Sequence, residues 1–182
     1  MNGFIVEKKI AADEIASLNA SATCSTNVDG GNAVTLGAYA NDNYTITLAG
    51  ATADVGVWMA YNPTERLTPV GTAPNIKYFA GLSADPRDYT NLATREVDIF
   101  KPQVEDIIGF TAANFGSNQV PDTTTNKYIT TAANGQLIAS DIAIAAGKVA
   151  FEILSVETLP FPQGGTVGMD FAALYVCKCT AN

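Results

Sequence analysis

The sequence predicts a mainly β protein: a single β-barrel or β-sandwich domain with an N-terminal arm and little helix. Short runs of alternating apolar and polar residues have the period of a strand with one buried face. Gly, Pro and Asn separate these runs at short intervals, as in barrels and sandwiches. The length of 182 residues suits one domain, and a hydrophobic content of 47% is enough for its core.

The N-terminal segment, residues 1–22, has only a weak helical stripe of apolar residues. We therefore expect an arm or short amphipathic segment, with residues 23–182 as the β domain. An ordinary first strand of the domain is the alternative. The residues of this arm that we expect to reach an adjacent subunit are Phe4, Ile5 and Val6.

Strand patterns begin after a turn at residues 29–32, where two glycines supply the positive φ angles that such turns need. Tyr44, Ile46 and Leu48 alternate with threonines, which predicts a half-buried strand. Further strands are expected within residues 54–63, 75–83 and 94–102.

The second half holds the longest strand patterns. Residues 127–140 resemble a hairpin with Asn134-Gly135 as a two-residue turn. Residues 148–161 and 166–179 predict two long strands joined by a segment rich in Pro and Gly. The patterns that fit either a helix or a strand are residues 101–115 and 140–148.

The three cysteines are Cys24, Cys177 and Cys179. Cys177 and Cys179 share one face of the last strand, which is apolar on both faces until Lys178 and therefore predicted to be central. Three thiols without histidine do not make a four-ligand zinc site, and no redox C-x-x-C motif is present. We expect buried thiols and no metal or cofactor, with a disulfide as the alternative.

The chain contains no histidine, so the common Ser-His-Asp and Cys-His catalytic systems are excluded. Two pairs of acids, Glu105-Asp106 and Asp85 with Asp88, are the residues on which a carboxylate-based hydrolase would depend. Neither pair has supporting spacing, so solvated loop acids and a protein that is not an enzyme are expected.

Charge is scarce and unevenly distributed. Charged residues make up 15% of the chain against roughly 25% in ordinary domains, and 20 Thr and 14 Asn take part of their place. Residues 15–64 carry three acids and no base, and residues 107–140 carry one acid and one base. Because interface cores are depleted in charge, we expect these stretches to lie against other subunits; solvation by Thr and Asn is the alternative. The net charge of -8 and scattered basic residues argue against nucleic-acid binding.

The stretch "KYITTAANGQLIASDIAIAAGKVAFEILSVETLPFPQGGTVGMDFAALYVCKC" resembles the closing β-barrel strands of capsid decoration (cement) proteins of tailed bacteriophages. The likeness covers the last third of the chain and is one of sequence style, so no functional residue is carried over. It implies a virion protein that binds the outside of a capsid lattice, with the major capsid protein or other virion subunits as partners and often as a homo-oligomer.

Two other functions fit the sequence: a tail- or fibre-associated adhesin that binds a host glycan, and the carboxylate hydrolase considered above. Trp58 and Tyr61 distinguish decoration from adhesion, because exposure in a groove favours a glycan site and packing on a neighbour favours assembly. The N-terminus lacks a signal-peptide pattern, and no apolar run approaches the ~20 residues of a membrane span. We therefore expect synthesis in the host cytoplasm, no membrane partner and a final location in the virion.

Overall fold

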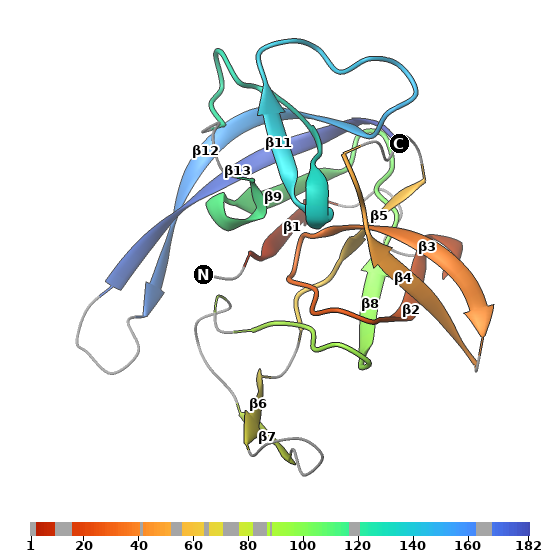
Figure 1. The fold of residues 1–182 in the computed structure, drawn as a ribbon. Coiled ribbons are helices and arrows are strands. Elements are labelled where there is room, and N and C mark those ends of the chain that lie inside the picture. The colour runs from red at the N-terminus through yellow and green to blue at the C-terminus, as the bar shows by residue number, and fades with distance from the viewer. Residues whose placement is uncertain are drawn as a thin grey trace.

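The computed structural model describes residues 3–9, 16–40, 42–51, 56–63, 66–70, 77–81, 87, 89–116, 121–162 and 169–182. This part of the chain forms a six-stranded antiparallel sheet, a closed five-stranded barrel and a two-stranded hairpin (Figure 1). Its three-residue helical segments are 3-10 turns at Ala16–Leu18, Ala112–Asn114 and Ala133–Gly135. The prediction of a mainly β fold with little helix is confirmed.

The six-stranded sheet has the order β1-β9-β13-β12-β10-β11. Its strands are β1 (Ile5–Lys9), β9 (Ile107–Thr111), β10 (Tyr128–Thr131), β11 (Leu137–Ser140), β12 (Ala150–Pro162) and β13 (Met169–Ala181). As predicted, the closing strand β13 is central, with β9 on one side and β12 on the other. Leu174 to Cys177 are all buried, which explains why both faces of this strand are apolar.

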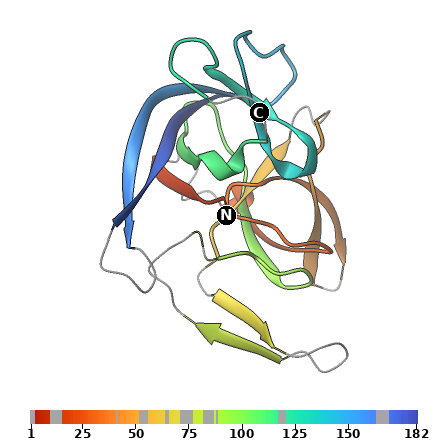
Figure 2. The same cartoon turned by 60° about the vertical axis from the view of Figure 1, so that its left-hand side comes forward.

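The barrel has the order β2-β4-β3-β5-β8, and β2 and β4 pair in parallel. Its strands are β2 (Asn19–Cys24), β3 (Ala33–Ala40), β4 (Asn43–Leu48), β5 (Val57–Ala60) and β8 (Glu96–Phe100). The separate hairpin consists of β6 (Arg66–Val70) and β7 (Lys77–Gly81) and lies below both other units in Figures 1 and 2. Closure of the barrel leaves its short strands without an unpaired edge strand.

The largest core cluster lies between the sheet and one wall of the barrel. Met59 and Phe100 come from barrel strands, and Phe110 and Phe151 come from the sheet. The rings of Phe110 and Phe151 meet edge to face with their centroids 5.4 Å apart. Burial of each of these side chains stabilises the fold by about 1.5–3 kcal/mol, so the barrel and the sheet are held by one shared core.

Asparagine side chains also join the two units by binding backbone groups. Asn62 Oδ1 accepts from the N–H of Ile5 at 3.0 Å, and its Nδ2 donates to the Ile5 carbonyl at 2.6 Å. Asn182 makes the same pair of bonds with Val57, at 3.0 and 2.8 Å. In each case the side-chain amide takes the place of a neighbouring peptide group, so it satisfies backbone that a strand would otherwise bind.

A third asparagine, Asn114, is buried completely. Its Oδ1 accepts from the N–H and the hydroxyl of Thr111, both at 2.9 Å, and its Nδ2 donates to the Gly30 carbonyl at 2.7 Å. Gly31 lies beside it at a φ of +79°, in the predicted turn, and a Cβ on Gly31 would be 2.5 Å from Asn114 Nδ2. Glycine is required there both for the backbone angle and for the space.

The N-terminal segment is part of the fold where the structure describes it. Residues 5–9 pair with β9 as an edge strand of the sheet, and residues 19–24 pair with β4 and β8 in the barrel. Where it is described, this segment follows the alternative of an ordinary first strand, and residues 1–2 and 10–15 lie outside the described residues. Of the weak helical stripe, Ile10 and Ile15 lie outside the described residues, and Leu18 lies in the 3-10 turn at Ala16–Leu18.

The predicted hairpin at residues 127–140 is present, but its turn is longer than predicted. The last strand pair is Thr131 with Leu137, so five residues close the hairpin instead of two. Asn134 and Gly135 do adopt positive φ angles of 58° and 71°, but within a 3-10 turn. The Gly135 N–H donates to the Ala49 carbonyl in the barrel, so the longer loop gains a contact that a tight turn would not reach.

The two ambiguous segments have different outcomes. Residues 101–115 contain strand β9 followed by a 3-10 turn. Residues 141–149 form neither helix nor strand, and Ile142 is 72% exposed. Among the described helical residues, none belongs to a helix with the length and apolar character needed to span a bilayer.

Candidate interaction surfaces

The apolar residues near the N-terminus are mostly buried within the chain itself. Phe4 and Ile5 are almost fully buried and Val6 is half-buried. The Phe4 ring meets the ring of Phe161 edge to face at 5.3 Å, and Ile5 belongs to the core between sheet and barrel. The expected contact of Phe4 and Ile5 with another subunit is corrected accordingly: these side chains support the fold of their own chain.

The two aromatic residues that were to distinguish decoration from adhesion have different environments. Trp58 is only 8% exposed and packs in the barrel interior. This corrects the expectation that it contacts a partner or glycan. Tyr61 follows β5, is half-buried and packs on Phe100 with ring centroids 4.7 Å apart. Tyr61 alone therefore lies where a ligand could meet it, in the groove described below.

Three of the exposed large apolar residues, Leu154, Val156 and Phe171, lie on the β12–β13 hairpin. After Ile153 in β12 and before Leu174 in β13, these strands pair only with each other among the described residues, and the hairpin extends away from the sheet at the left of Figure 1. Phe171 is 64% exposed and Val156 is 47% exposed. Phe171 continues the row of side chains that faces the core further along β13, but here no core lies beneath it. We name residues 154–162 with 169–173 the β12–β13 ribbon.

The opposite face of the β12–β13 ribbon is fixed to the rest of the molecule. Phe161 is buried against Phe4, and the Arg87 guanidinium lies 4.8 Å from the centre of the Phe161 ring. Arg87 also pairs with Asp170, the cross-strand neighbour of Phe161. Because a cation over an aromatic ring and an ion pair hold this face, the exposed face is presented in a defined orientation.

A second exposed apolar surface lies at the tip of the β3–β4 hairpin, at the right of Figure 1. Tyr39 and Tyr44 are cross-strand neighbours whose rings meet edge to face at 5.0 Å. Tyr39 is 62% exposed. Tyrosine is favoured in binding surfaces because its ring is large and rigid and its hydroxyl bonds to polar groups.

The charge-poor first half of the chain covers much of the barrel surface with hydroxyl groups. The hydroxyls of Thr35 and Thr47 lie 2.8 Å apart across β3 and β4. A shallow groove of about 450 Å³ is lined mainly by hydroxyl-bearing residues: Thr23, Cys24, Ser25, Thr45, Ile46, Thr47 and Thr94. Threonine side chains therefore face solvent in this chain where other proteins have charged ones.

A larger groove, of about 520 Å³, lies where β2 and β8 run side by side and Tyr61 follows β5. Its lining residues are Asn19, Ala20, Ser21, Tyr61, Asn62, Asp98 and Ile99. The Ser21 hydroxyl donates to Asp98 Oδ1 at 2.6 Å, and the Tyr61 hydroxyl donates to Asn19 Oδ1 at 3.1 Å. We name this surface the β2–β8 groove.

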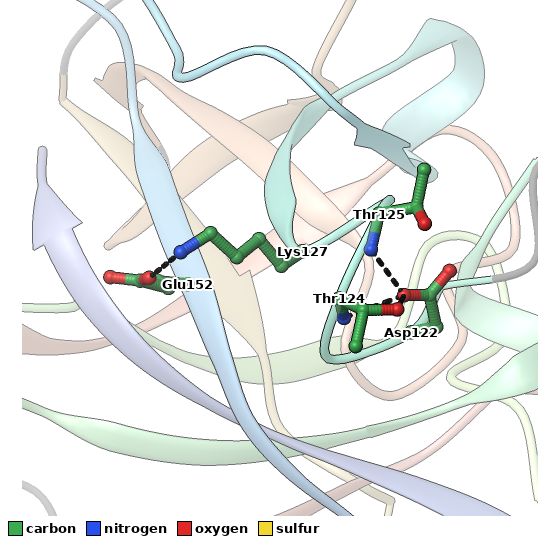
Figure 3. Close-up of polar contacts among 5 residues, drawn as sticks. All are labelled: Asp122, Thr124, Thr125, Lys127 and Glu152. Carbon is green, nitrogen blue, oxygen red and sulfur yellow. Dashed lines mark hydrogen bonds and ion pairs between the residues drawn. The ribbon is translucent and has the colours of Figure 1, made fainter.

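The loop before β10 holds one acid in a closed set of hydrogen bonds. Figure 3 shows Asp122 Oδ1 accepting from the N–H of Thr124 at 2.7 Å, its hydroxyl at 2.8 Å and the N–H of Thr125 at 2.6 Å. These bonds lower the pKa of Asp122 to about 2, because they stabilise the ionised carboxylate. Nearby, Lys127 Nζ pairs with Glu152 at 2.8 Å, which raises the pKa of the lysine. The carboxylate of Asp122 thus orders its own loop.

The three thiols are free and buried. Cys177 and Cys179 share the core face of β13, as predicted, whereas Cys24 lies in the barrel interior. Burial raises the pKa of Cys177, and burial together with the nearby Asp106 raises that of Cys179 to about 12. Thiols held in this protonated form pack as small apolar groups and react slowly.

The carboxylates singled out in the sequence do not gather in a cleft where the structure describes them. Asp106 is fully buried and accepts from the N–H of Gln103 at 2.8 Å, whereas Glu105 is exposed and pairs with Lys178 at 3.1 Å. Asp85 and Asp88 lie outside the described residues. Within the described ranges, no three residues of the Cys, Asp and Glu types come together as a metal site would need.

Comparisons of the chain with protein-family models, with curated proteins and with solved structures give no match. The function of the surfaces described above is therefore inferred from the chemistry of their own residues.

Sequence reasoning missed the most exposed aromatic residues. Alternation placed Phe171 on the same face as Cys177, which predicted burial. A signal was nonetheless present in strand length, because β13 has thirteen residues and its neighbour β9 has five. A strand that outruns its neighbour must expose part of its core-facing row. Tyr39 was missed because it lies beyond the closed part of the barrel, which the pattern alone does not delimit.

Proposed function

We propose that this chain is a non-catalytic structural subunit of a tailed-phage virion, which binds the outside of a preformed capsid and stabilises it. The observation that carries the proposal is the β12–β13 ribbon, whose exposed face presents Phe171 and Val156 without a charged side chain among them. Charge depletion with an aromatic anchor is the composition of an interface core.

The shape of the chain supports the same function. The ribbon, the tip of the β3–β4 hairpin and the exposed loop after β11 project from different sides of the fold in Figures 1 and 2. Each projection exposes at most three large apolar side chains among its described residues, whereas specific interfaces bury about 800 Å² on each partner. In a lattice, however, several weak contacts per subunit add together, because one bound contact raises the effective concentration of the next. Several small contact surfaces on one subunit favour virion subunits, including further copies of this chain, as partners.

The test compares capsids that carry the protein with capsids that lack it, during heating and at low salt. We expect particles with the protein to survive higher temperature and lower ionic strength. If both kinds of particle resist equally, and the purified protein stays monomeric and does not bind capsids, the proposal is wrong.

A pair of matched variants tests the surface that carries the proposal. Phe171→Ser removes the exposed aromatic ring of the ribbon, and Val104→Ser removes an apolar side chain of similar exposure (52%) from a loop outside it. Truncating an interface anchor weakens binding by about 2 kcal/mol or more, whereas truncating an exposed residue elsewhere changes little. We expect Phe171→Ser to lower the affinity of each contact with the capsid by at least about tenfold, which is measured as a loss of capsid occupancy. The thermal unfolding of Phe171→Ser should match that of Val104→Ser. Equal occupancy for both variants would exclude the ribbon as the contact.

A further inference from the structure

The β2–β8 groove has the chemistry of a small-molecule site, and the function proposed above does not use it. Its floor is the antiparallel ladder in which Ser21 faces Asp98. The wall is Tyr61, whose backbone N–H donates to the Asp98 carbonyl at 2.8 Å. Side chains on paired strands hold their positions better than side chains on loops, so the groove is largely formed before any ligand binds.

The groove combines hydrogen-bonding groups of both kinds with an apolar ring. Asn19 offers an amide with donors and an acceptor, Ser21 offers a hydroxyl, and Asp98 offers a carboxylate that can accept up to about four hydrogen bonds. One of these bonds comes from Ser21, at 2.6 Å. Both side chains of this pair are exposed to solvent, so the remaining capacity of the carboxylate faces the groove. A ligand that suits this set carries several hydroxyl groups beside an apolar face.

The charge of the lining residues further limits the class of ligand that the groove can bind. Among the lining residues that the structure describes, Asp98 is the one acid and no base is present. An anionic ligand would be repelled by this carboxylate, and the described lining offers no lysine or arginine to compensate. A bound divalent cation needs several oxygen ligands with more than one carboxylate, which this lining does not offer. The ligands that fit this lining are therefore neutral and rich in hydroxyl groups.

We propose that the β2–β8 groove binds a neutral sugar, with hydroxyls of one hexopyranose bonded to Asp98 and Asn19 and its apolar face against Tyr61. The volume of about 520 Å³ lies within the range of small-molecule sites. Because the groove is open and shallow, the affinity for a single sugar ring is low, with a Kd of about 1 mM. In a particle with many copies, such sites bind a polysaccharide through their number.

The experiment is a titration of the isotopically labelled protein followed by ¹H–¹⁵N NMR, with methyl glycosides of glucose, galactose and mannose as probes. Glucuronate and glucosamine serve as anionic and cationic counterparts of similar shape. We expect at least one neutral glycoside to shift the amide signals of residues 19–21, 61 and 98–99 in a saturable way. Glucuronate is expected to bind at least about tenfold more weakly, because of Asp98.

Variants locate the binding. Asp98→Asn keeps an acceptor for Ser21 but removes the charge, and it should weaken binding about tenfold, since bonds to charged groups are the stronger ones. Tyr61→Phe removes the hydroxyl that donates to Asn19 and should weaken binding severalfold. The matched control is Asp42→Asn, which alters an exposed acid outside the groove and should leave the Kd unchanged. Thermal unfolding of each variant shows that the fold is intact.

Three results would each overturn the sugar proposal. The first is that no neutral glycoside gives a saturable shift up to about 50 mM, far above the expected Kd. The second is that the shifts are centred on other residues, and the third is that the Asp98→Asn variant binds the sugar as tightly as the unchanged protein. Tighter binding of glucosamine than of its neutral counterpart would replace it with a site for cations. None of these results bears on capsid binding, because the groove and the β12–β13 ribbon share no residue.

Discussion

Replacing Asn114 with alanine should separate the contribution of side-chain amides from that of the apolar core. In the folded chain, Asn114 is fully buried and joins the turn after β9 to the Gly30 carbonyl in the turn before β3. Asn114→Ala removes the partner of two buried backbone groups, the N–H of Thr111 and the carbonyl of Gly30. The Thr111 hydroxyl is less affected, because it also lies 3.4 Å from the carbonyl oxygen of Phe4.

The expected cost follows from these two groups. A buried donor or acceptor left without a partner costs about 1–3 kcal/mol, so the two together predict a loss of about 3 kcal/mol in the free energy of unfolding. For a domain of this length, 1 kcal/mol shifts Tm by about 2–4 °C, so Tm should fall by about 6–12 °C. Urea denaturation measures the first quantity and thermal denaturation the second, and an unchanged m-value would show that the unfolding transition remains the same.

Asn27→Ala is the matched control. Asn27 is exposed and its Oδ1 accepts one backbone bond, from the N–H of Ala93 at 3.0 Å. Water replaces a lost bond at an exposed site, so this variant should cost less than about 1 kcal/mol. If Asn114→Ala is no more destabilising than Asn27→Ala, the buried amide does not hold the sheet and the barrel together, and the reasoning fails.

The remaining predictions concern the N-terminus, the thiols and one acid. Deleting residues 1–9 should lower Tm sharply by removing strand β1 and the buried Phe4 ring, and an unchanged Tm would mean that this segment is an arm after all. Cys177 and Cys179 should resist alkylation at pH 8 until the protein unfolds, because burial raises their pKa values; rapid labelling of folded protein would contradict this. The loop held by Asp122 should be fully stabilised above about pH 4, where the acid is ionised even in the unfolded chain, and should lose that stabilisation as pH falls through about 2. Amide signals of residues 124–125 report this transition, and Asp122→Asn should abolish it.

The sequence predicted strands well where alternation is regular. The run at residues 44–48 and the two long strands at the C-terminus appear within a few residues of their expected positions, because one buried face imposes a period of two on them. It did not predict that β2 pairs in parallel with β4, or that β1 joins a sheet whose next strand begins a hundred residues later. Such pairings depend on which distant segments meet, and no local pattern records that.

The candidate surfaces were harder to predict than the fold. Phe4 was assigned to an arm that reaches an adjacent subunit, and Trp58 to a surface that meets a neighbouring subunit or a glycan, but both are buried. By alternation Phe171 shares a face of β13 with the buried Cys177, yet the core ends before it. Exposure therefore depended on how far each strand extends past its neighbours, a quantity that only the assembled sheet defines.

The shortage of charge has two separable causes in this fold: neutral polar groups that replace ions, and an exposed apolar surface on the β12–β13 ribbon. One is that neutral groups perform tasks for which other proteins use ions: Asn62 and Asn182 bind backbone at strand edges, and threonine hydroxyls cover the barrel. This cause explains the hydroxyl-covered part of residues 15–64 without any partner, but it leaves the exposed rings of Tyr39 and Tyr44 unexplained. It does not explain Phe171, because an exposed phenylalanine on a fixed strand neither satisfies backbone nor favours contact with water. Assembly is therefore supported by the β12–β13 ribbon and not by the overall composition. A soluble variant that lacks only the exposed ring of Phe171 is consequently a sharper test of assembly than any change to the net charge.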